Sequence, residues 1–234
     1  MQRLDKLLSE AGVASRKDLK TIIRAGRVTV DGQVVRVSET KVDETAALVC
    51  VDGSPVGKQR TIILMLHKPA GYVTSTEDPR DKTVMELIPA EYRYLDPKPV
   101  GRLDKETEGL LLFTNDGQLA HRILSPKRRV WKRYYAEHEG HAGGADITAF
   151  AEGITLKDGD HCLPARLIPQ GPGKSIVEVC EGKYHQVRRM LASRGMPVTY
   201  LKRIAEDSLE LGDLQLGQVR EVALSELSCH IAQA

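Results

Sequence analysis

The chain has 234 residues, 41% of them hydrophobic and 28% charged, with a formal net charge of +2. This composition is that of one or two ordinary folded domains and excludes an intrinsically disordered chain. No run approaches the roughly 18 consecutive apolar residues that a membrane-spanning helix needs, and the start lacks the apolar core of a signal peptide. We therefore expect a soluble protein in the cytoplasm that does not contact a membrane.

The cysteines are widely separated along the chain. They form neither a C-x-x-C pair nor a Cys/His zinc spacing, and most have apolar neighbours. We therefore expect buried, reduced thiols and no metal site. The residues concerned are Cys50, Cys162, Cys180 and Cys229.

Basic residues are concentrated in three segments. Residues 1–36 contain eight Lys or Arg against four acidic residues, and the stretches 126–135 and 182–205 contain no acidic residue. Aromatic residues are interleaved with the charges of the last two stretches. The pattern favours a surface that follows phosphates and stacks on bases, although a solvated basic surface would give the same pattern. The aromatic residues are Trp131, Tyr134, Tyr135, Tyr184 and Tyr200.

The first elements that the sequence predicts are two short helices and a hairpin. Residues 3–10 place leucines on one helical face, and Gly12 follows as a stop signal. Ser15 is a candidate N-cap for a second helix, which Gly26 ends. Alternating residues then flank Asp31-Gly32, which predicts a tight β-hairpin.

Together these segments resemble the S4 domain, a small RNA-binding module of ribosomal proteins, some tRNA synthetases and several RNA-modifying enzymes. The resemblance spans nearly the whole module. It implies that the basic face of the second helix contacts RNA phosphates while the apolar face packs inward. An unrelated helix pair with a hairpin is the alternative. The residues expected to bind RNA are Arg16, Lys17, Lys20 and Arg24.

A second domain follows the first. Residues 51–60 have the composition of a turn and linker, so we place the domains at 1–60 and 61–234. Strands and helices do not alternate regularly and no dinucleotide-binding fingerprint is present, so we expect an α+β fold with a mixed, mainly antiparallel sheet and flanking helices. Strand patterns occur at 62–66, 109–115, 132–140, 175–182 and 198–204, and helix patterns at 84–88, 118–124, 146–152 and 185–194.

Polar residues gather beside glycine in residues 66–75, 100–117 and 181–190. Loops that rigid strands hold in place are where catalytic groups are usually displayed. Asp104 lies in the middle segment, close to Arg102. Taken alone, it is a candidate for a catalytic carboxylate or for a structural ion pair. We interpret Glu106 and Glu108 as surface acids, and a glycosidase-like carboxylate pair is the alternative.

The order and the amino-acid sequences of these segments resemble the motifs of the RsuA-type family of bacterial ribosomal RNA pseudouridine synthases. The family pattern is Lys-Pro with Gly-Tyr-Val, then Gly-Arg-Leu-Asp with Gly-Leu-Leu-Leu and Thr-Asn-Asp-Gly, then Lys-x-Tyr, then Glu-Gly-x-Tyr-His-Gln-Val-Arg-Arg-Met. The chain matches it from Lys68, Gly101, Lys132 and Glu181 onward. Members of this group commonly carry an N-terminal S4 domain, so the resemblance covers almost the whole chain.

The resemblance implies isomerisation of uridine to pseudouridine, with no cofactor and no metal. Enzymes of this kind break the bond between uracil N1 and the ribose, turn the base and rejoin it through C5. Asp104 matches the family's essential aspartate and would act on the ribose as nucleophile or base. Arg188 would be its cationic partner, and Tyr134 would stack on the flipped base. Further residues expected to bind substrate or RNA are Arg102, Lys68, Lys132, Lys183 and Arg189.

Two positions depart from the family pattern. His67 stands where Asn is usual, and we interpret it as a local hydrogen-bonding residue. Glu206 stands where an apolar Ile is usual, which bears on the packing beneath the pocket and on the choice of substrate.

The resulting expectation is a monomer that modifies one uridine of 16S small-subunit ribosomal RNA, free or in a ribosomal assembly intermediate. One alternative is a pseudouridine synthase for 23S ribosomal RNA. A second is a non-catalytic RNA-binding or ribosome assembly protein. A third is a hydrolase, which would release uracil or cleave the RNA.

Overall fold

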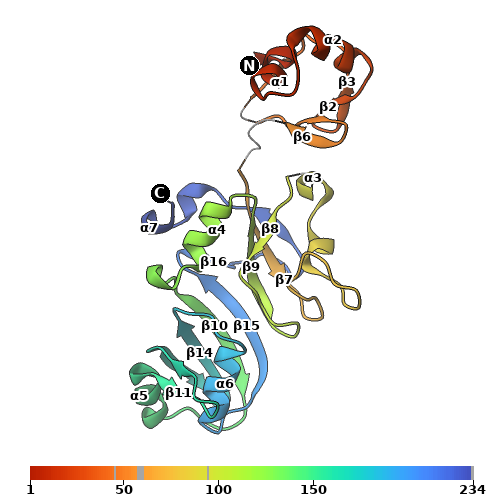
Figure 1. The fold of residues 1–234 in the computed structure, drawn as a ribbon. Coiled ribbons are helices and arrows are strands. Elements are labelled where there is room, and N and C mark those ends of the chain that lie inside the picture. Colours follow the sequence, from red (N-terminus) through yellow and green to blue (C-terminus); the bar gives the residue numbers. More distant parts are fainter. Residues whose placement is uncertain (45, 57–60, 94, 233–234) are drawn as a thin grey trace. The chain divides into compact units, whose positions relative to one another are not determined.

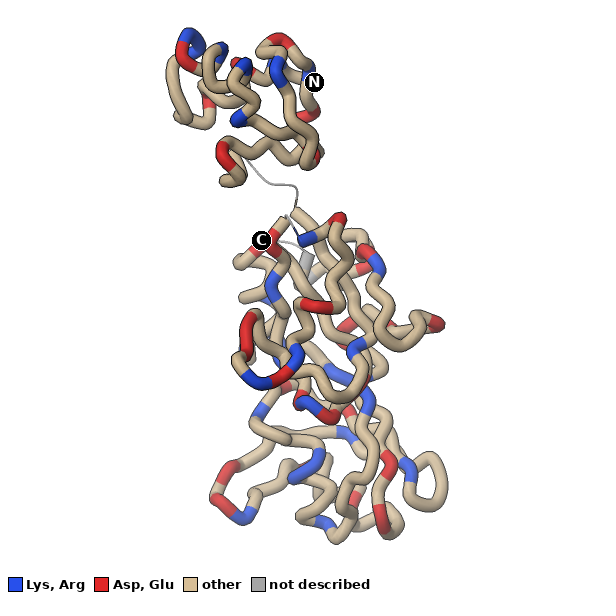
Figure 2. The backbone as a smooth tube through the Cα atoms, turned by 90° about the vertical axis from the view of Figure 1, so that its right-hand side faces the viewer, with Lys and Arg blue, Asp and Glu red and all other residues tan. Residues whose placement is uncertain are grey.

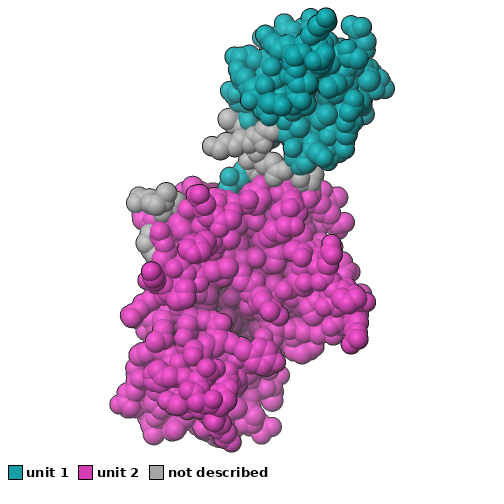
Figure 3. All heavy atoms as spheres, viewed as in Figure 1, with its two compact units in different colours: residues 1–61 teal, residues 62–234 magenta. Residues whose placement is uncertain are grey.

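The computed structural model describes residues 1–44, 46–56, 61–93 and 95–232, which form two compact units, Met1–Thr61 and Ile62–Ala234 (Figure 1; Figure 3). The expected domain boundary at residue 60 lies outside the described residues. Part of the expected linker is a strand, because β6 (Ser54–Val56) pairs with β5 (Val49–Val51) across the Asp52-Gly53 turn. The interpretation of residues 51–56 as linker is therefore wrong, since a turn with positive φ closes a hairpin there.

The first unit contains the predicted helix pair and hairpin. Helix α1 covers Leu4–Glu10 and α2 covers Arg16–Arg24, and the hydroxyl of Ser15 caps α2 by accepting from the N–H of Asp18. These helices and the hairpin are confirmed. The strands are β1 (Gln2–Arg3), which pairs with β4 (Lys41–Val42), and the sheet β3-β2-β5-β6, in which β2 is Val28–Val30 and β3 is Gln33–Val35.

The second unit is built on one large sheet, whose main path runs β13-β14-β10-β15-β9-β7-β17 (Figure 1). Strand β8 pairs with β9, and β16 pairs with β15. Its strands are β7 (Ile63–Lys68), β8 (Lys98–Val100), β9 (Glu108–Thr114), β10 (Lys132–His138), β13 (Arg166–Gly171), β14 (Lys174–Val179), β15 (Val198–Glu206), β16 (Leu209–Glu210) and β17 (Val219–Glu221); β11 (Ile154–Thr155) and β12 (His161–Cys162) form a separate hairpin.

Helices flank this sheet, so the α+β prediction is confirmed. Helices α5 and α6 pack on the face of β10, β14 and β15, where Phe150, Val187, Met190 and Val177 share one core cluster. The helices of the unit are η1 (Val84–Leu87), α3 (Ala90–Arg93), α4 (Gly117–Leu124), η2 (Pro126–Arg128), α5 (Gly144–Glu152), α6 (Gln186–Ser193), η3 (Leu224–Glu226) and α7 (Cys229–Ala232), where η denotes a 3₁₀ helix.

Strands β7 and β9 are covered on both faces. Met65 and Leu112 point into the core cluster that contains α4, whereas Leu64 and Leu111 point into the cluster that contains η1. Because both faces of these strands are buried, β7 and β9 have continuous apolar runs and do not alternate between apolar and polar residues. The end of this rigid pair carries the loop that holds Asp104.

Strands β9 and β15 run parallel, and they are the one parallel strand pair among the described residues. They are joined at two positions, Lys202 with Glu108 and Arg203 with Gly109. A Cβ on Gly109 would lie 2.1 Å from the carbonyl oxygen of Arg203, and its φ is +108°. Only glycine therefore allows the two strands to approach this closely.

The cysteines are not all buried. Cys50, Cys162 and Cys180 are buried, as predicted, but Cys229 is exposed because it begins the short terminal helix α7. Among the described residues, no helix is both long and apolar enough to cross a membrane.

Candidate active site

A small pocket of about 50 Å³ lies at the end of β9, between the loop that precedes this strand and the start of α6. Asp104 and Thr107 come from the loop, Tyr134 from β10, and His185 from the turn before α6. The remaining lining residues are Arg102, Leu103, Val179, Glu181, Gly182, Gln186, Val187 and Leu201.

The carboxylate of Asp104 is held at the centre of this pocket by cationic and polar side chains. Its Oδ2 lies 3.9 Å from Nε of Arg188 and 3.5 Å from the hydroxyl of Thr107. Its Oδ1 lies 3.5 Å from Nε2 of His185. These contacts orient the carboxylate. Because none of them is as short as a strong hydrogen bond, its oxygens still have lone pairs that can accept from a substrate. About a third of its side chain is exposed, at 32%.

The loop that carries Asp104 is fastened from below by Lys68, at the end of β7. The side chain of Lys68 is 0% exposed. Its ammonium group donates to the backbone carbonyls of Pro69, Asp104, Lys105 and Thr107 at 2.9–3.2 Å. Burial lowers the pKa of Lys68 from 10.5 to about 8. Lys68 thus braces the first motif against the Asp104 loop, and its ammonium group is surrounded by the loop it holds.

Tyr134 closes the wall of the pocket opposite the loop. It is half-buried and packs against two core clusters, one on each side of the β9–β15 contact. Burial raises the pKa of its phenol, so the hydroxyl stays protonated at neutral pH. A neutral aromatic ring beside Asp104 offers a stacking face and a proton donor, not an anion.

Beneath Tyr134 lies a buried group of charges. Glu206 is 2% exposed, and its carboxylate lies 3.4 Å from the guanidinium of Arg203 and 3.9 Å from the ammonium of Lys132. Arg203 also donates to the carbonyl of Leu110 at 2.7 Å. Glu206 thus replaces apolar packing with charge compensation between β10 and β15. An RNA-binding role for Lys132 is wrong, since its Nζ is buried and donates to the carbonyl of Val130.

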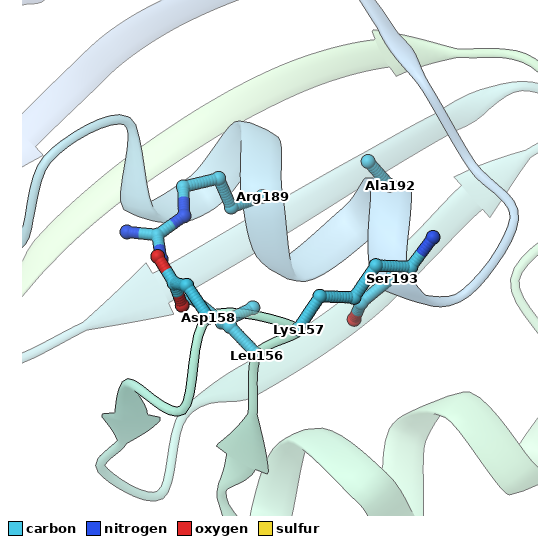
Figure 4. A pocket seen from close by; sticks show the side chains of 6 residues that line it. All are labelled: Leu156, Lys157, Asp158, Arg189, Ala192 and Ser193. Atoms are coloured by element: carbon cyan, nitrogen blue, oxygen red, sulfur yellow. The ribbon is translucent and has the colours of Figure 1, made fainter.

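Two expected RNA-binding residues face away from Asp104. Arg189 follows Arg188 on α6 but points to the other side, where it pairs with Asp158 and Asp160 (Figure 4). It lines a separate cavity of about 260 Å³ together with the β11–β12 turn. Lys183 lies 3.5 Å from Asp160. Both cations thus have acidic partners, which a bound phosphate would have to replace.

The structure brings together Asp104, Tyr134 and Arg102 in one pocket, and Arg188 lies beside it, 3.9 Å from the Asp104 carboxylate. Arg102 is exposed at the rim of the pocket. The four basic residues of α2 belong to the other unit, where they are exposed along one helix (Figure 2). One of them, Arg16, pairs with Asp5 at 3.2 Å.

His185 is a site residue that the sequence interpretation did not single out. It occupies the left-handed region, with φ of 48°, and ends the turn that leads into α6. Its position in the fourth motif could have marked His185 as a site residue. The left-handed backbone that turns its ring toward Asp104 could not be predicted from the sequence. His67, by contrast, is a local hydrogen-bonding residue as interpreted, with Nδ1 2.7 Å from the carbonyl of Leu214.

Among the residues that the structure describes, no group of three His, Cys, Asp or Glu side chains has the arrangement of a metal site. The pocket and its surroundings offer a carboxylate beside an arginine, a histidine and a neutral phenol.

Comparison with known proteins places this geometry in a family. A family model described as RNA pseudouridylate synthase matches residues 62–193, and the S4 domain model matches residues 2–48. An uncharacterized RNA pseudouridine synthase of Bacillus subtilis, YtzG, is 40% identical over 96% of this chain and 96% of its own. The ribosomal small subunit pseudouridine synthase A of Vibrio parahaemolyticus is 38% identical over 94% of this chain and 97% of its own.

A solved structure agrees with these matches. The crystal structure of a pseudouridylate synthase has a TM-score of 0.67 and 30% sequence identity, covering 97% of this chain and 98% of that chain. Sequence and fold thus agree over almost the full length. The chain belongs to the RNA pseudouridylate synthase family and is an RNA-modifying isomerase with an N-terminal S4 domain.

Proposed function

We propose that the protein converts one uridine of 16S small-subunit ribosomal RNA into pseudouridine, as a monomer, with Asp104 as the essential group. The observation that carries this proposal is the pocket that joins the Asp104 carboxylate with Arg188, His185 and Tyr134. The choice of small-subunit RNA rests on the full-length similarity to the Vibrio protein named for that subunit.

The reaction needs each part of this pocket. The glycosidic bond between N1 and C1′ breaks, a bond from C5 to C1′ forms, and the proton on C5 is lost while N1 gains one. Asp104 engages the ribose as nucleophile or base, and the guanidinium of Arg188, 3.9 Å away, is its cationic partner. Tyr134 stacks on the extruded base, which an unstacked uridine requires. Its protonated phenol can donate the proton that N1 gains, whereas the proton on C5 leaves to a base, the Asp104 carboxylate or water.

The two units divide the task in this proposal. Residues 1–60 form the S4 domain and dock the RNA through Lys17, Lys20 and Arg24, which are exposed on α2. Residues 61–234 form the catalytic domain. Arg102, exposed at the rim of the pocket, holds a phosphate near the flipped nucleotide.

The test is to map pseudouridines in ribosomal RNA from a strain that lacks this protein. Naked 16S RNA, naked 23S RNA and small-subunit assembly intermediates are incubated with the purified protein, and modified sites are read by carbodiimide labelling and primer extension. We expect one new pseudouridine in 16S RNA. A new site in 23S RNA instead would refute the target, and no new site in any RNA would refute the function.

Two variants of the same loop sharpen the test. Asp104→Asn keeps the shape and removes the charge, and we expect the rate to fall by at least about 10²–10⁴-fold, the range for loss of a positioned acid or base. Glu106→Gln changes an exposed acid two residues away and should retain full activity. Equal activity of the Asp104→Asn protein would contradict the role of Asp104.

A further inference from the structure

One aromatic ring near the pocket is left open to solvent. Tyr184 is 76% exposed, whereas the other aromatic residues of the basic segments are half-buried. Those residues already have partners. Tyr135 donates to Glu137, Tyr200 donates to Glu108, and Trp131 lies under the guanidinium of Arg166.

The exposed ring of Tyr184 is backed by a second ring. Its centroid lies 3.9 Å from that of His185, with an interplanar angle of 16°. His185 in turn lies with Nε2 3.5 Å from the Asp104 carboxylate. The outer face of Tyr184 is therefore the surface of a two-ring stack that begins at the catalytic carboxylate and ends in solvent.

Hydrogen bonds hold the turn that carries this stack. The N–H of Lys183 donates to the side-chain amide oxygen of Gln186, whose amide nitrogen donates to Glu181 at 2.8 Å. Arg189 donates to the carbonyl of Tyr184, and the N–H of Arg189 donates to the carbonyl of His185.

His185 holds a left-handed conformation within this framework, with φ of 48°. A non-glycine residue keeps such a conformation only where its surroundings determine it, and strained residues of this kind cluster at functional sites. The two rings are thus fixed in place before any ligand binds.

Base flipping leaves the neighbouring bases without a stacking partner, and the exposed ring of Tyr184 can replace that partner. Extruding a uridine removes a stacking neighbour from the adjacent bases, which costs free energy. Unpaired bases are recognised in RNA mainly by stacking on aromatic side chains, and such stacking tolerates any base because every base has a π-face. The pocket beside His185 holds the target, so the base that reaches Tyr184 is one that flanks it.

We propose that Tyr184, backed by His185, is a stacking platform for one unpaired nucleobase that flanks the target uridine. This inference rests on the proposed function, since it needs an RNA whose uridine enters the Asp104 pocket. The platform makes the enzyme favour a uridine with an unpaired neighbour, as in a loop or an assembly intermediate, over one within a continuous helix.

The test uses uridine heptamers in which 2-aminopurine replaces one residue on either side of the central uridine. The fluorescence of 2-aminopurine is quenched when the base stacks on an aromatic ring. We expect the full-length wild-type protein to quench the probe from one flanking position. Tyr184→Ala should lose that quench and bind about 5- to 100-fold more weakly, the range for loss of one aromatic stack.

Two further variants serve as controls. Tyr184→Phe keeps the ring and should keep both the quench and the affinity. Leu224→Ala truncates an exposed apolar residue that lies in η3, outside the walls of the Asp104 pocket, and should bind as wild type does. Equal thermal unfolding midpoints would show that Tyr184→Ala leaves the fold intact.

The outcomes separate this inference from the proposed function. Asp104→Asn should keep the quench while making no pseudouridine, because stacking does not need the reaction. If the wild type modifies ribosomal RNA but Tyr184→Ala quenches and binds as the wild type does, the platform is refuted and the function stands. If the wild type quenches no probe, the platform is also refuted, and the exposed ring is a protein contact. A quench that Tyr184→Ala abolishes, without modification of any RNA by the wild type, would support the platform and refute the function.

Discussion

Lys68 shows how a single side chain fixes the geometry of the Asp104 loop. A buried ammonium group that donates to several carbonyls replaces its lost hydration with protein dipoles, so removing it would take one hydrogen-bond donor from each of those carbonyls. Burial still outweighs the attraction of the nearby carboxylates of Glu106, Asp104 and Glu108 in its effect on the pKa of Lys68, which falls to about 8. Stability and pH are therefore linked at this residue.

The sign of that linkage can be predicted. Between pH 8 and 10.5 the unfolded chain keeps its proton on Lys68 while the folded protein loses it, so the contribution of Lys68 to the free energy of unfolding rises with pH. We expect the difference in unfolding free energy between wild type and Lys68→Met to grow across this window. Its slope should approach about 1.4 kcal/mol per pH unit. Urea unfolding of both proteins at several pH values measures it, and a constant difference would contradict the prediction.

For single residues, the sequence predicted which side chains belong to the site better than it predicted what those side chains contact. Asp104, Tyr134 and Arg188 come together because the loop before β9, strand β10 and helix α6 meet at the same part of the large sheet. The burial of Lys68 was missed because a lysine before a loop with proline and glycine gives the same pattern whether it faces RNA or the loop's own carbonyls. The burial of Lys132 was missed because it lies in a basic stretch whose other charges are exposed or half-buried. The role of His185 depends on a backbone angle that no residue pattern encodes.

Among the elements, the contact between β9 and β15 depends on a glycine. Gly109→Ala would bring a methyl group against the backbone of Arg203 in a conformation that alanine resists. We expect it to destabilise the protein by about 3 kcal/mol or more, from strain and overlap together.

Gly117 at the start of α4 provides the matched control. It has open space around its Cβ position and no positive φ, so Gly117→Ala should stabilise the protein by about 0.4–1 kcal/mol. Both variants are compared by urea unfolding. Similar effects of the two substitutions would show that the close strand approach is not required.

The charges between β10 and β15 give a second prediction for the elements. Glu206→Gln leaves Arg203 and Lys132 buried without a countercharge, and removing one partner of a buried ion pair costs about 3–5 kcal/mol. Glu210→Gln removes an exposed partner of Arg133 and should change stability by less than about 0.5 kcal/mol. Unfolding midpoints in urea distinguish them, and a neutral Glu206→Gln would show that the charges are not coupled.

Element positions were predictable where the pattern was long. The apolar run of β9 and the amphipathic α2 were found with small errors at their ends. The short strands β6, β11, β12 and β17 were missed because two or three residues carry no periodicity, and β6 contains a proline. Tertiary pairing, not local propensity, makes them strands.

For the whole molecule, the sequence indicated two domains because residues 51–60 have the composition of a turn and linker after a complete S4-like module. The strand order of the large sheet could not be predicted, because pairing between strands distant in sequence depends on packing. The proposed docking role of the first unit leads to a prediction about salt.

RNA binding should depend on salt through α2. The double substitution Lys20→Gln with Arg24→Gln should lower the slope of log affinity against log salt by roughly 0.7 per phosphate contact on single strands and roughly 0.9 on duplex RNA. The swap Lys20→Arg with Arg24→Lys keeps both charges and should keep the slope. The measurement is filter binding to 16S RNA at several salt concentrations. An unchanged slope in the neutralised variant would exclude α2 as the docking surface.

The parallel contact between β9 and β15 has a mechanical consequence. Among the described residues, only two paired backbone positions of the sheet join the strands that carry the Asp104 loop to the strands that support Tyr134 and α6. The pocket spans this seam, and its volume of about 50 Å³ is far below the roughly 300 Å³ or more of an ordinary ligand site. Bending at the seam would widen the pocket for an entering uridine and would bring Asp104 and Arg188 closer than 3.9 Å as it closes. The seam therefore divides the large sheet into two parts, with the Asp104 carboxylate on one part and its cationic partner Arg188 on the other.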